Sequence, residues 1–412
     1  MVLMGKKAAN HAGSITKKVE TKNGKQYESW RCRYSLPDGS RKEKKFSSQA
    51  AAQEFLTQTL ADIQNGEYLE STSITVGQWL DTWLAEYCGH LKYNCLKSYK
   101  SHVEIHLKPG IGKIKLIDLN AAELQKFFNK LSKTGKKTSR KDKTTGKQIV
   151  TCSPLSPKSI YNIHGTLSSA LATAVDIDFI KSNPAEKVNL PHVYKKEMHP
   201  IDSSQLSSYL AACTNDQYRY FLQIMPLIGL RVAEQAGLTW DNIDFEKGTI
   251  TVKKQLLERS LADGGPCMDT PKNHKSRILK PAPFAMTLFA ARKVEQEKEK
   301  EKAGDLWQGY QSEEERRTAP VFTSKLGGYV NQDTLLKHAK KALSSIGMDA
   351  SVMHDLRHSF AVLGIQAGDD FKTISENLGH STVAFTMDRY GHLTDKMRDE
   401  SSKKMQALLD AL

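Results

Sequence analysis

The sequence has no long apolar segment and few cysteines, and each absence excludes a class of protein. Its most apolar stretch, residues 221–230, contains Gln223 and Pro226 and is far shorter than the roughly 20 residues of a membrane-spanning helix. No apolar run follows the first residues, which argues against a secretory signal. The six cysteines are scattered without a CxxC pair, which excludes a disulfide scaffold and a cysteine-rich zinc site. We therefore expect a cytoplasmic protein without membrane contact.

The sequence has fewer acidic than basic residues. The 412 residues include 60 lysines and arginines against 46 aspartates and glutamates, which gives a formal charge of +14. Such an excess favours a polyanionic partner, above all nucleic acid. Hydrophobic residues make up 39% and charged residues 26% of the chain, which is typical of folded globular proteins. At about 100–200 residues per domain, the length predicts two to four domains.

The first domain is predicted at residues 1–66, as a three-stranded basic sheet followed by one helix. Residues 28–34 alternate large and polar side chains, residues 37–39 are a Pro-Asp-Gly turn, and residues 41–46 can form the returning strand. Residues 1–46 hold twelve basic and four acidic residues. The sheet is either a β-ribbon that reads a DNA groove or a solvated face of a small α+β domain. The candidate DNA-binding residues are Lys17, Lys18, Arg31, Arg33, Arg41, Lys42, Lys44 and Lys45.

The second domain, residues 73–193, is predicted to be all-α. Apolar residues recur at helical spacing after Thr75, and Ser156-Pro157 gives an N-cap followed by proline at the first helical position. A basic insertion at residues 132–153 interrupts the helices as a loop or hairpin. It either contacts backbone phosphates or is a solvated loop. The candidate DNA-binding residues of the insertion are Lys136, Lys137, Arg140 and Lys141.

The third domain, residues 197–412, is predicted to be mainly helical with a small antiparallel sheet. Strands are expected at residues 248–252, 255–259 and 277–279, where β-branched and large apolar residues recur. Pro283 opens a long helix that becomes highly charged. We expect this helix to present a solvated face.

Arg231 is the first candidate for chemistry in the third domain. It follows Gly229-Leu230 at the start of an apolar helix. Its guanidinium is either a structural ion pair, with Glu234 as the partner, or a clamp for an anion. The local sequence alone favours the ion pair and leaves the clamp open.

His354 and Arg357 lie three residues apart and therefore share a helical face. His354 and His358 lie four apart, as the zinc ligands of HExxH helices do. The position of the HExxH glutamate holds Asp355, however, and Arg357 would place a permanent cation beside the metal. We therefore expect no metal site here, and we expect His358 to be a packing residue.

The remaining candidates are His380, which follows a Leu-Gly pair, Tyr390, ten residues later, and Lys272, in a basic segment between two expected strands. Together with Arg231, His354 and Arg357, they supply the groups needed for phosphoryl transfer. Two guanidinium groups can clamp the non-bridging oxygens of a phosphodiester. A tyrosine phenol can form a covalent ester with the phosphorus. An imidazole and a lysine can move the protons of the attacking and leaving oxygens.

In this order, the motifs resemble those of the tyrosine recombinase family, specifically integrases of phages and integrative conjugative elements. The resemblance rests on the Gly-Leu-Arg segment at Arg231, the His-Asp-Leu-Arg segment ending at Arg357, Leu-Gly-His at His380 and Tyr390 followed by Gly-His-Leu. It implies a small α+β arm-binding domain, an all-α core-binding domain and a mixed, mainly-α catalytic domain with a small antiparallel sheet. The hairpin lysine of the family fits Lys272 better than Lys275.

The resemblance also implies the roles of these residues. Tyr390 would attack the phosphate and form a 3′-phosphotyrosine link, while Arg231 and Arg357 hold the phosphate oxygens. His354 would handle the tyrosine proton, and His380 would bond a non-bridging oxygen. Lys272 would protonate the leaving 5′-oxygen. The resemblance implies neither a metal nor another cofactor.

The partners implied by the resemblance are double-stranded DNA attachment sites and three further copies of the chain in a homotetramer on DNA. An excisionase and a DNA-bending host protein are expected as helpers, and the protein is expected at the nucleoid. A C-terminal helix at residues 394–412 would dock on a neighbouring protomer or fold back on its own domain. The alternatives are a Xer-like resolvase, which is expected to lack the basic sheet at residues 1–66, a type IB topoisomerase, and a catalytically silent DNA-binding regulator.

Overall fold

The computed structural model describes most of the chain: residues 13–22, 25–36, 39–64, 74–141, 148–194, 197–271 and 276–391, together with residues 402, 403, 405, 406, 409 and 410. The chain forms two compact units, Met1–Lys195 and Lys196–Leu412. The division of the first unit into two domains stays a prediction. In the described part of the chain, no helix is long and apolar enough to cross a membrane.

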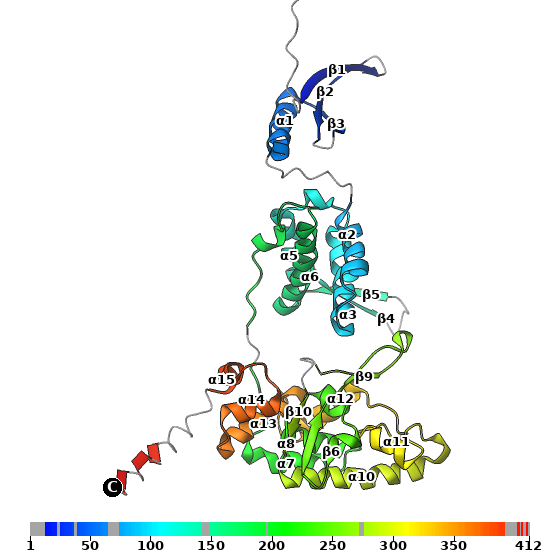
Figure 1. The fold of residues 1–412 in the computed structure, drawn as a ribbon, viewed down its shortest axis with the longest axis vertical. Helices are drawn as coiled ribbons and strands as arrows, with labels where there is room; N and C mark the ends of the chain where they lie inside the picture. Colours follow the sequence, from blue (N-terminus) through cyan, green and yellow to red (C-terminus); the bar gives the residue numbers. More distant parts are fainter. Residues whose placement is uncertain are drawn as a thin grey trace, which may run out of the picture. The chain divides into compact units, whose positions relative to one another are not determined.

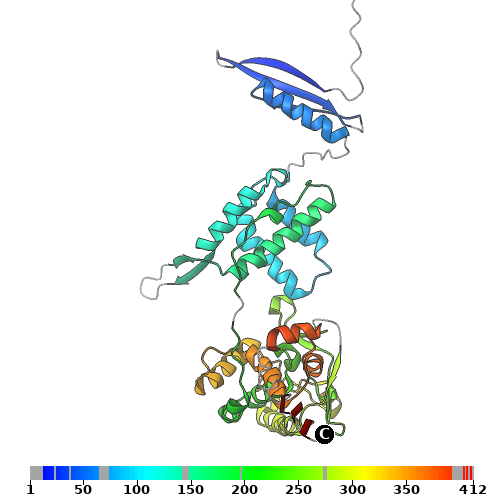
Figure 2. The ribbon, with the colours of Figure 1, turned by 90° about the vertical axis from the view of Figure 1, so that its left-hand side faces the viewer.

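A three-stranded antiparallel sheet begins the first unit, and one helix lies across one of its faces (Figure 2). Its elements are β1 (Ser14–Lys22), β2 (Lys25–Ser35), β3 (Arg41–Phe46) and α1 (Gln49–Gln64). The Ser48 hydroxyl accepts a hydrogen bond from the amide of Ala51, 3.3 Å away, and so stabilises the start of α1. The predicted sheet and helix are confirmed.

The apolar side chains of the sheet gather on the face that α1 covers. Cys32 and Tyr34 of β2 are buried there with Leu56 of α1. Successive residues of a strand point to opposite faces, so Arg31 and Arg33 lie on the open face. The strand pattern of the sequence therefore separates a small core from a polar surface.

Helices form the body of the rest of the first unit where the structure describes it: α2 (Val76–Thr82), α3 (Tyr93–His102), α4 (Lys108–Ile111), α5 (Ala121–Thr134) and α6 (Pro157–Asp176). A π-helical turn, Val103–Leu107, joins α3 to α4. Thr75, Asn120 and Ser156 cap α2, α5 and α6 with their side chains. The cap at Ser156 is the one that the sequence predicts. The indole of Trp79 is fully buried and donates a hydrogen bond to the Ala170 carbonyl, 2.9 Å away, which ties α2 to α6.

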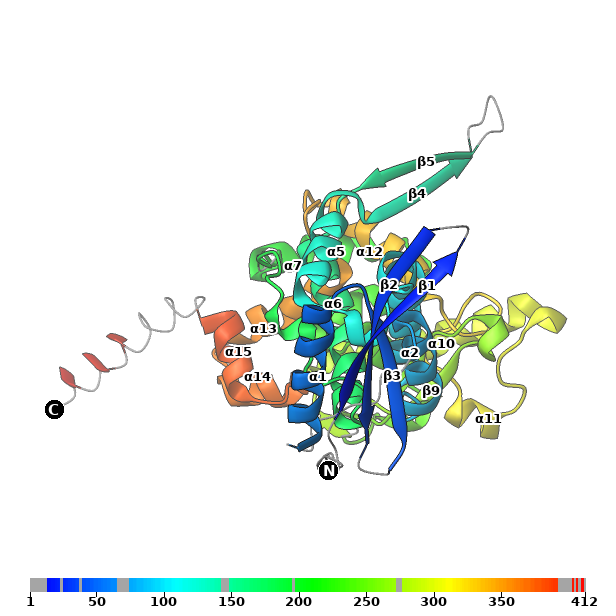
Figure 3. The same ribbon diagram turned by 90° about the horizontal axis from the view of Figure 1, so that it is seen from above.

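The basic insertion is a β-hairpin. Strands β4 (Lys136–Lys141) and β5 (Gln148–Ser153) pair antiparallel and project from the helical body (Figures 2 and 3). The sequence left a loop or a hairpin open, and the structure shows the hairpin.

The second unit is mostly helical (Figure 1). Its helices are α7 (Ser203–Cys213), α8 (Arg219–Ile228), α9 (Val232–Ala236), α10 (Pro283–Ala303), α11 (Glu313–Thr318), α12 (Gln332–Ser345), α13 (Met353–Ala367), α14 (Phe371–Leu378) and α15 (Val383–Tyr390). The long helix that begins at Pro283 is confirmed.

Two small antiparallel sheets accompany these helices. Strands β10 (Arg277–Leu279), β7 (Thr249–Val252) and β6 (Ile243–Asp244) form one sheet, and β8 (Gln255–Leu257) pairs with β9 (Cys267–Asp269) in the other. The strands expected from the sequence are present, although β6 and β9 were not foreseen. A Cβ at Gly237 would lie 2.7 Å from the backbone of Gln255, so only glycine lets the end of α9 approach β8 this closely.

A main core lies among α8, α10, α12 and the β10-β7-β6 sheet, and a smaller apolar cluster joins α13, α14 and α15. These last three helices lie side by side (orange to red in Figure 1). The smaller cluster contains Ile365, Leu378 and Tyr390. The expected nucleophile is therefore also part of a core.

The predicted C-terminal helix lies mostly outside the described residues. Of its apolar residues, Met405 and Leu409 are described, and both are more than half exposed. Neither docking on a neighbour nor packing on the same domain is tested by them, so the role of the tail stays a prediction.

Candidate active site

Arg231 lies at the start of α9. A tight backbone turn precedes it, and its side chain is held by a hydrogen bond. Gly229 precedes it with a φ of +64°, a left-handed conformation that glycine adopts without steric cost. A Cβ at Gly229 would lie 2.6 Å from the ring of Phe360. Arg231 Nη1 donates a hydrogen bond to Glu234 Oε1, 2.6 Å away, and about a quarter of the Arg231 side chain is exposed. The ion pair favoured by the sequence is present.

Glu234 is fully buried and meets more than one arginine. Arg277, at the start of β10, donates from Nη2 to Glu234 Oε2 at 2.8 Å and from Nη1 to Oε1 at 3.3 Å. Burial opposes the charge on Glu234, but the hydrogen bonds and charges of Arg277 and Arg231 outweigh it and lower the pKa to about 2. Glu234 is therefore a permanent anion at the centre of an arginine cluster.

Arg357 is the most deeply buried of the three arginines, with 2% of its surface exposed. Its Nη1 donates to the Gly229 carbonyl at 2.7 Å and lies 3.9 Å from Glu234 Oε2. Burial, followed by the charge of Arg231, lowers the pKa of Arg357 to about 9, so the guanidinium remains cationic at neutral pH. The positive charges of Arg231 and Arg357 are thus held close together by Glu234, which both side chains approach.

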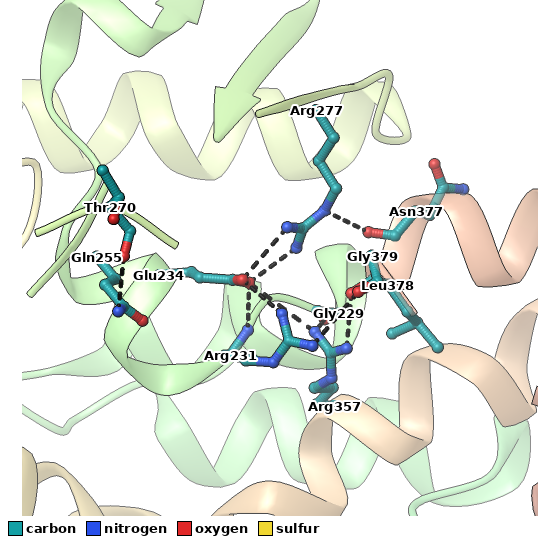
Figure 4. A network of polar contacts seen from close by, with 10 residues as sticks. All are labelled: Gly229, Arg231, Glu234, Gln255, Thr270, Arg277, Arg357, Asn377, Leu378 and Gly379. Carbon is teal, nitrogen blue, oxygen red and sulfur yellow. Dashed lines mark hydrogen bonds and ion pairs between the residues drawn. The ribbon is translucent and has the colours of Figure 1, made fainter. Parts of the chain in front are cut away.

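The C-terminus of α14 supplies the second set of acceptors (Figure 4). The carbonyls of Asn377, Leu378 and Gly379 accept hydrogen bonds from Arg277 Nε at 3.0 Å, Arg357 Nη2 at 2.6 Å and Arg231 Nη2 at 3.4 Å, respectively. The last carbonyls of a helix lack partners within the helix and carry partial negative charge. One helix end therefore orients all three guanidinium groups.

His380 follows this helix end directly. Gly379 has a φ of +66°, and the His380 amide donates to the Ser375 carbonyl at 3.0 Å, which closes α14 as in a Schellman motif. His380 Nδ1 lies 2.8 Å from the Thr386 hydroxyl. Burial and the charges of Arg357 and Arg231 lower the pKa of His380 to about 4. The imidazole is therefore neutral near pH 7.

Tyr390 ends α15 with only 1% of its surface exposed. Its hydroxyl is hydrogen-bonded to His358 Nδ1 at 2.5 Å. Burial raises the pKa of Tyr390 to about 12, against the lowering effect of Arg357 and Arg389. His358 packs within this cluster, as expected from the sequence, and its hydrogen-bond partner is the expected nucleophile.

His354 lies one turn before His358 on α13. Its ring packs edge-to-face against that of His358, with centroids 4.9 Å apart. Burial and the charge of Arg357 lower the pKa of His354. The structure places His354 beside the imidazole that meets Tyr390, in the same row of α13 side chains.

Lys272 and Lys275 lie outside the described residues, so their assignment stays a prediction. The structure does describe the hairpin that leads into this segment. Gln255 Nε2 donates to the Thr270 carbonyl at 2.8 Å and so joins β8 to the residue after β9 (Figure 4). The chain returns at Arg277, inside the arginine cluster.

The candidate DNA-binding residues of the first sheet divide between its two faces. The pairing register assigns Lys18, Arg31, Arg33, Arg41 and Lys45 to the open face and Lys17, Lys42 and Lys44 to the face of α1. The Lys44 ammonium lies 4.4 Å from the ring centroid of Phe55 on α1. Sequence alone treated these eight residues as equivalent, and the strand register separates them.

The open face also contains acids. Glu43 lies 2.7 Å from Arg33 Nε and 3.1 Å from Arg31 Nη1, and Glu20 lies 2.6 Å from the Lys18 ammonium. Exposed ion pairs of this kind are weak, at most about 1 kcal/mol each. A DNA phosphate can therefore displace them.

The candidate residues of the basic insertion fall on one strand. Lys136, Lys137, Arg140 and Lys141 all belong to β4, opposite Ser153, Cys152, Ile149 and Gln148 of β5. Lys136 is exposed. The strand brings the four residues into a single short stretch of extended backbone.

Two residues of this site were not identified as functional from the sequence. Arg277 was assigned to a strand without a role, and His358 was expected in a core. Arg277 had a weak signal, because it is a basic residue at the start of a strand that follows a basic segment. For His358 the signal was its position one turn after His354 on the same helix.

Comparison with known proteins decides the family. The phage integrase family matches residues 199–397, and the N-terminal SAM-like domain of phage integrases matches residues 75–132. The first match contains every expected catalytic residue. The chain belongs to the phage integrase family of tyrosine recombinases. It is thus a tyrosine-type DNA recombinase of the kind that mobile elements encode.

Curated relatives span nearly the whole recombinase. A XerC-like tyrosine recombinase of Caldanaerobacter subterraneus is 25% identical over 384 residues, which are 88% of this chain and 90% of the relative. The ICEBs1 integrase of Bacillus subtilis is 25% identical over 379 residues, which cover 88% and 91% of the two chains. The match to the XerC-like relative extends across most of both chains, so the Xer-like alternative stays open.

Solved structures share the fold. The Tn1549 transposon integrase in complex with a circular intermediate DNA superposes with a TM-score of 0.62 at 20% identity, covering 82% of this chain and all of that one. A lambda integrase tetramer bound to a Holliday junction gives a TM-score of 0.53 at 16% identity, with coverages of 88% and 95%. The expected tyrosine recombinase fold is confirmed.

Proposed function

We propose that this recombinase integrates and excises a mobile element by cutting and rejoining DNA at attachment sites through a phosphotyrosine on Tyr390. The observation that carries the proposal is the arginine cluster at the end of α14, one short helix before Tyr390. The cluster holds three guanidinium groups against one carboxylate. Such a site keeps an excess of fixed positive charge where a phosphodiester would gain negative charge.

Arg231 and Arg357 are proposed to hold the non-bridging phosphate oxygens. The two differ in how they are held. Arg357 is buried and fixed by two short hydrogen bonds, whereas Arg231 keeps solvent-exposed surface. Arg231 can therefore reach a bound phosphate directly, and its contact with Glu234 sets the orientation. The ion pair and the anion clamp, which the sequence posed as alternatives, are compatible in this arrangement.

His380 is proposed to donate a hydrogen bond to a non-bridging oxygen from Nε2. Its Nδ1 already contacts Thr386, and a partner on one ring nitrogen fixes the role of the other. Lys272 is proposed to protonate the leaving 5′-oxygen. Its segment connects β9 to Arg277, which belongs to the cluster.

Attachment-site DNA is proposed to contact the open face of the N-terminal sheet and strand β4 as well as the catalytic unit. The support is the cluster of basic residues on each of these elements. The relatives include integrases whose structures contain DNA, and one of these, lambda integrase, forms a tetramer on a Holliday junction. We extend the homotetramer to this chain, with an excisionase and a DNA-bending host protein as helpers at the nucleoid.

Two alternatives remain as outcomes of the test. A Xer-like resolvase would act on paired sites with the same chemistry, and deletion of residues 1–66 would then leave recombination unchanged. An integrase would keep cleavage at core sites after that deletion but lose intermolecular integration. A catalytically silent regulator would bind DNA without forming an adduct.

The decisive experiment is covalent trapping on a nicked suicide duplex made from the DNA that flanks the gene. The cut strand loses a short fragment, which prevents religation and accumulates the adduct. We expect a slowly migrating species on a denaturing gel with the wild type and none with Tyr390→Phe, while both proteins shift the duplex on a native gel. An adduct that forms equally well with Tyr390→Phe would contradict the assignment of the nucleophile.

A further inference from the structure

His358 and Tyr390 are joined by a direct hydrogen bond inside the α13–α15 cluster. Nδ1 of the imidazole lies 2.5 Å from the phenolic oxygen, and the two ring centroids are 5.8 Å apart with the planes tilted by 57°. The roles implied by family resemblance leave His358 unused and assign the tyrosine proton to His354. The geometry assigns that proton differently.

We propose that His358 is a catalytic residue that receives the proton of the Tyr390 hydroxyl as its oxygen attacks the phosphorus. This inference rests on the proposed phosphotyrosine chemistry and adds the group that activates the nucleophile. A general base must lie within hydrogen-bond reach of the proton that it removes. His358 meets this condition, while His354 packs against the ring of His358.

The proposed proton transfer uses the lone pair of His358 Nδ1. In the tautomer with a proton on Nε2, the Nδ1 lone pair of His358 accepts the hydrogen bond donated by Tyr390. Attack forms the bond between the tyrosine oxygen and phosphorus, and the phenolic proton moves to Nδ1. The bond from phosphorus to the 5′-oxygen breaks, and that oxygen takes its proton from a lysine ammonium, proposed to be Lys272. In the rejoining step the imidazolium returns its proton to Tyr390.

The surroundings of the pair keep the base inactive until a phosphate arrives. The charged and titratable groups around His358 are His354 and Arg357 on α13, Arg389 and Tyr390 on α15, and His380 between α14 and α15. Burial, then His354 and the two arginines, lower the pKa of His358 to about 3. Burial raises the pKa of Tyr390 to about 12, so the proton stays on the phenol.

A phosphodiester between Arg231 and Arg357 would change this balance. Its negative charge offsets the arginines that lower the pKa of His358, and the pKa of the imidazole therefore rises. Attack on phosphorus simultaneously removes electron density from the phenolic oxygen and makes its proton easier to transfer. His358 thus gains basicity only when the substrate occupies the arginine cluster.

The test compares two substitutions that separate proton transfer from positioning. The side-chain amide of His358→Asn reaches the position of Nδ1, so this variant keeps a hydrogen bond to Tyr390 but has no basic nitrogen. His358→Ala loses both. Cleavage of the suicide duplex is followed by rapid quench with normal DNA and with a 5′-bridging phosphorothiolate. The sulfur leaving group needs no proton, so this substrate reports on activation of the nucleophile alone.

We expect both variants to bind DNA like the wild type and to cleave at least about 100-fold more slowly on both substrates. Their rates should rise more steeply with pH than the wild-type rate, because hydroxide must replace the imidazole. Cleavage by His358→Asn within about threefold of the wild type on both substrates would overturn the inference, since a hydrogen bond alone would then suffice. Faster cleavage by His358→Ala would overturn it as well and make His358 a restraint.

The same assay separates this inference from the proposed function. If the wild type forms an adduct that Tyr390→Phe does not form, the phosphotyrosine chemistry stands whatever the His358 variants do. Absence of an adduct with the wild type on both substrates would overturn the phosphotyrosine chemistry together with the inference. A circular dichroism melt of each variant identifies loss of fold.

Discussion

Both terminal nitrogens of Arg277 donate to the buried carboxylate of Glu234, at 2.8 and 3.3 Å. Through its Nε, the same guanidinium also reaches the end of α14 at Asn377. Arg277 thereby links the strand that follows the proposed lysine segment to the acid that holds the other two arginines.

Glu234 should make the stability of the second unit depend on pH. Its pKa in the folded protein is about 2, below the ordinary value of 4.5, so the folded state favours the charged form. The resulting contribution, on the order of 3 kcal/mol, is fully present above about pH 4.5 and is lost as the pH falls towards 2. Urea unfolding at a series of pH values measures this loss.

The variant Glu234→Gln provides the control for that pH dependence. It should unfold more easily at pH 7 by roughly 3–5 kcal/mol, because three guanidinium groups lose their shared anion. Between pH 4.5 and 3 its stability should fall less than that of the wild type. Parallel pH profiles for the two proteins would show that Glu234 is not the responsible group.

Substitutions of Arg357 and Arg231 should differ in their effect on the free energy of unfolding, although both residues are proposed to support cleavage. Arg357→Ala leaves the carbonyls of Gly229 and Leu378 without their buried donors, at roughly 1–3 kcal/mol for each group. Arg231→Ala removes a partly exposed side chain and should cost about 1 kcal/mol. Denaturant titration measures the difference, and the trapping assay should show no adduct for either variant. Equal destabilisation would contradict the buried contacts of Arg357.

Gly379→Ala should damage the site beyond the backbone strain that it introduces. Its Cβ would lie 2.9 Å from Arg277 Nη1 at a residue with a φ of +66°. Gly347 has a φ of +79° with open space around its Cβ position, so Gly347→Ala carries the strain alone, about 1 kcal/mol. We expect only Gly379→Ala to slow adduct formation, by tenfold or more. Similar rates for the two variants would argue against crowding of Arg277.

The open face of the N-terminal sheet should contribute to DNA affinity while the helix face does not. Arg33→Ala is expected to weaken binding and to reduce the slope of log affinity against log salt by about one, as loss of one phosphate contact does. Lys44→Ala should leave that slope unchanged, because its ammonium lies over Phe55. Fluorescence anisotropy over a range of salt concentrations tests the pair. An equal effect of both substitutions would contradict the division by strand register.

The sequence by itself determined the elements and the motif residues. Proline at the first helical position defined the starts of α6 and α10, and alternation defined β2 and β3. The order of Arg231, Arg357, His380 and Tyr390 indicated the family. These signals are local, because caps, alternation and short motifs act over a few neighbouring residues. Caps, alternation and short motifs can therefore be recognised in a single sequence.

Only the tertiary structure decided which side chains meet. Arg277 and Glu234 are 43 residues apart, and His358 and Tyr390 are 32 apart, so no periodicity relates the members of either pair. Their contacts arise where α14 ends against α9 and β10, and where α15 packs beside α13. Burial then shifts the pKa values of these groups, since an enclosed site strengthens the interactions between charges and removes the water that would otherwise hydrate them.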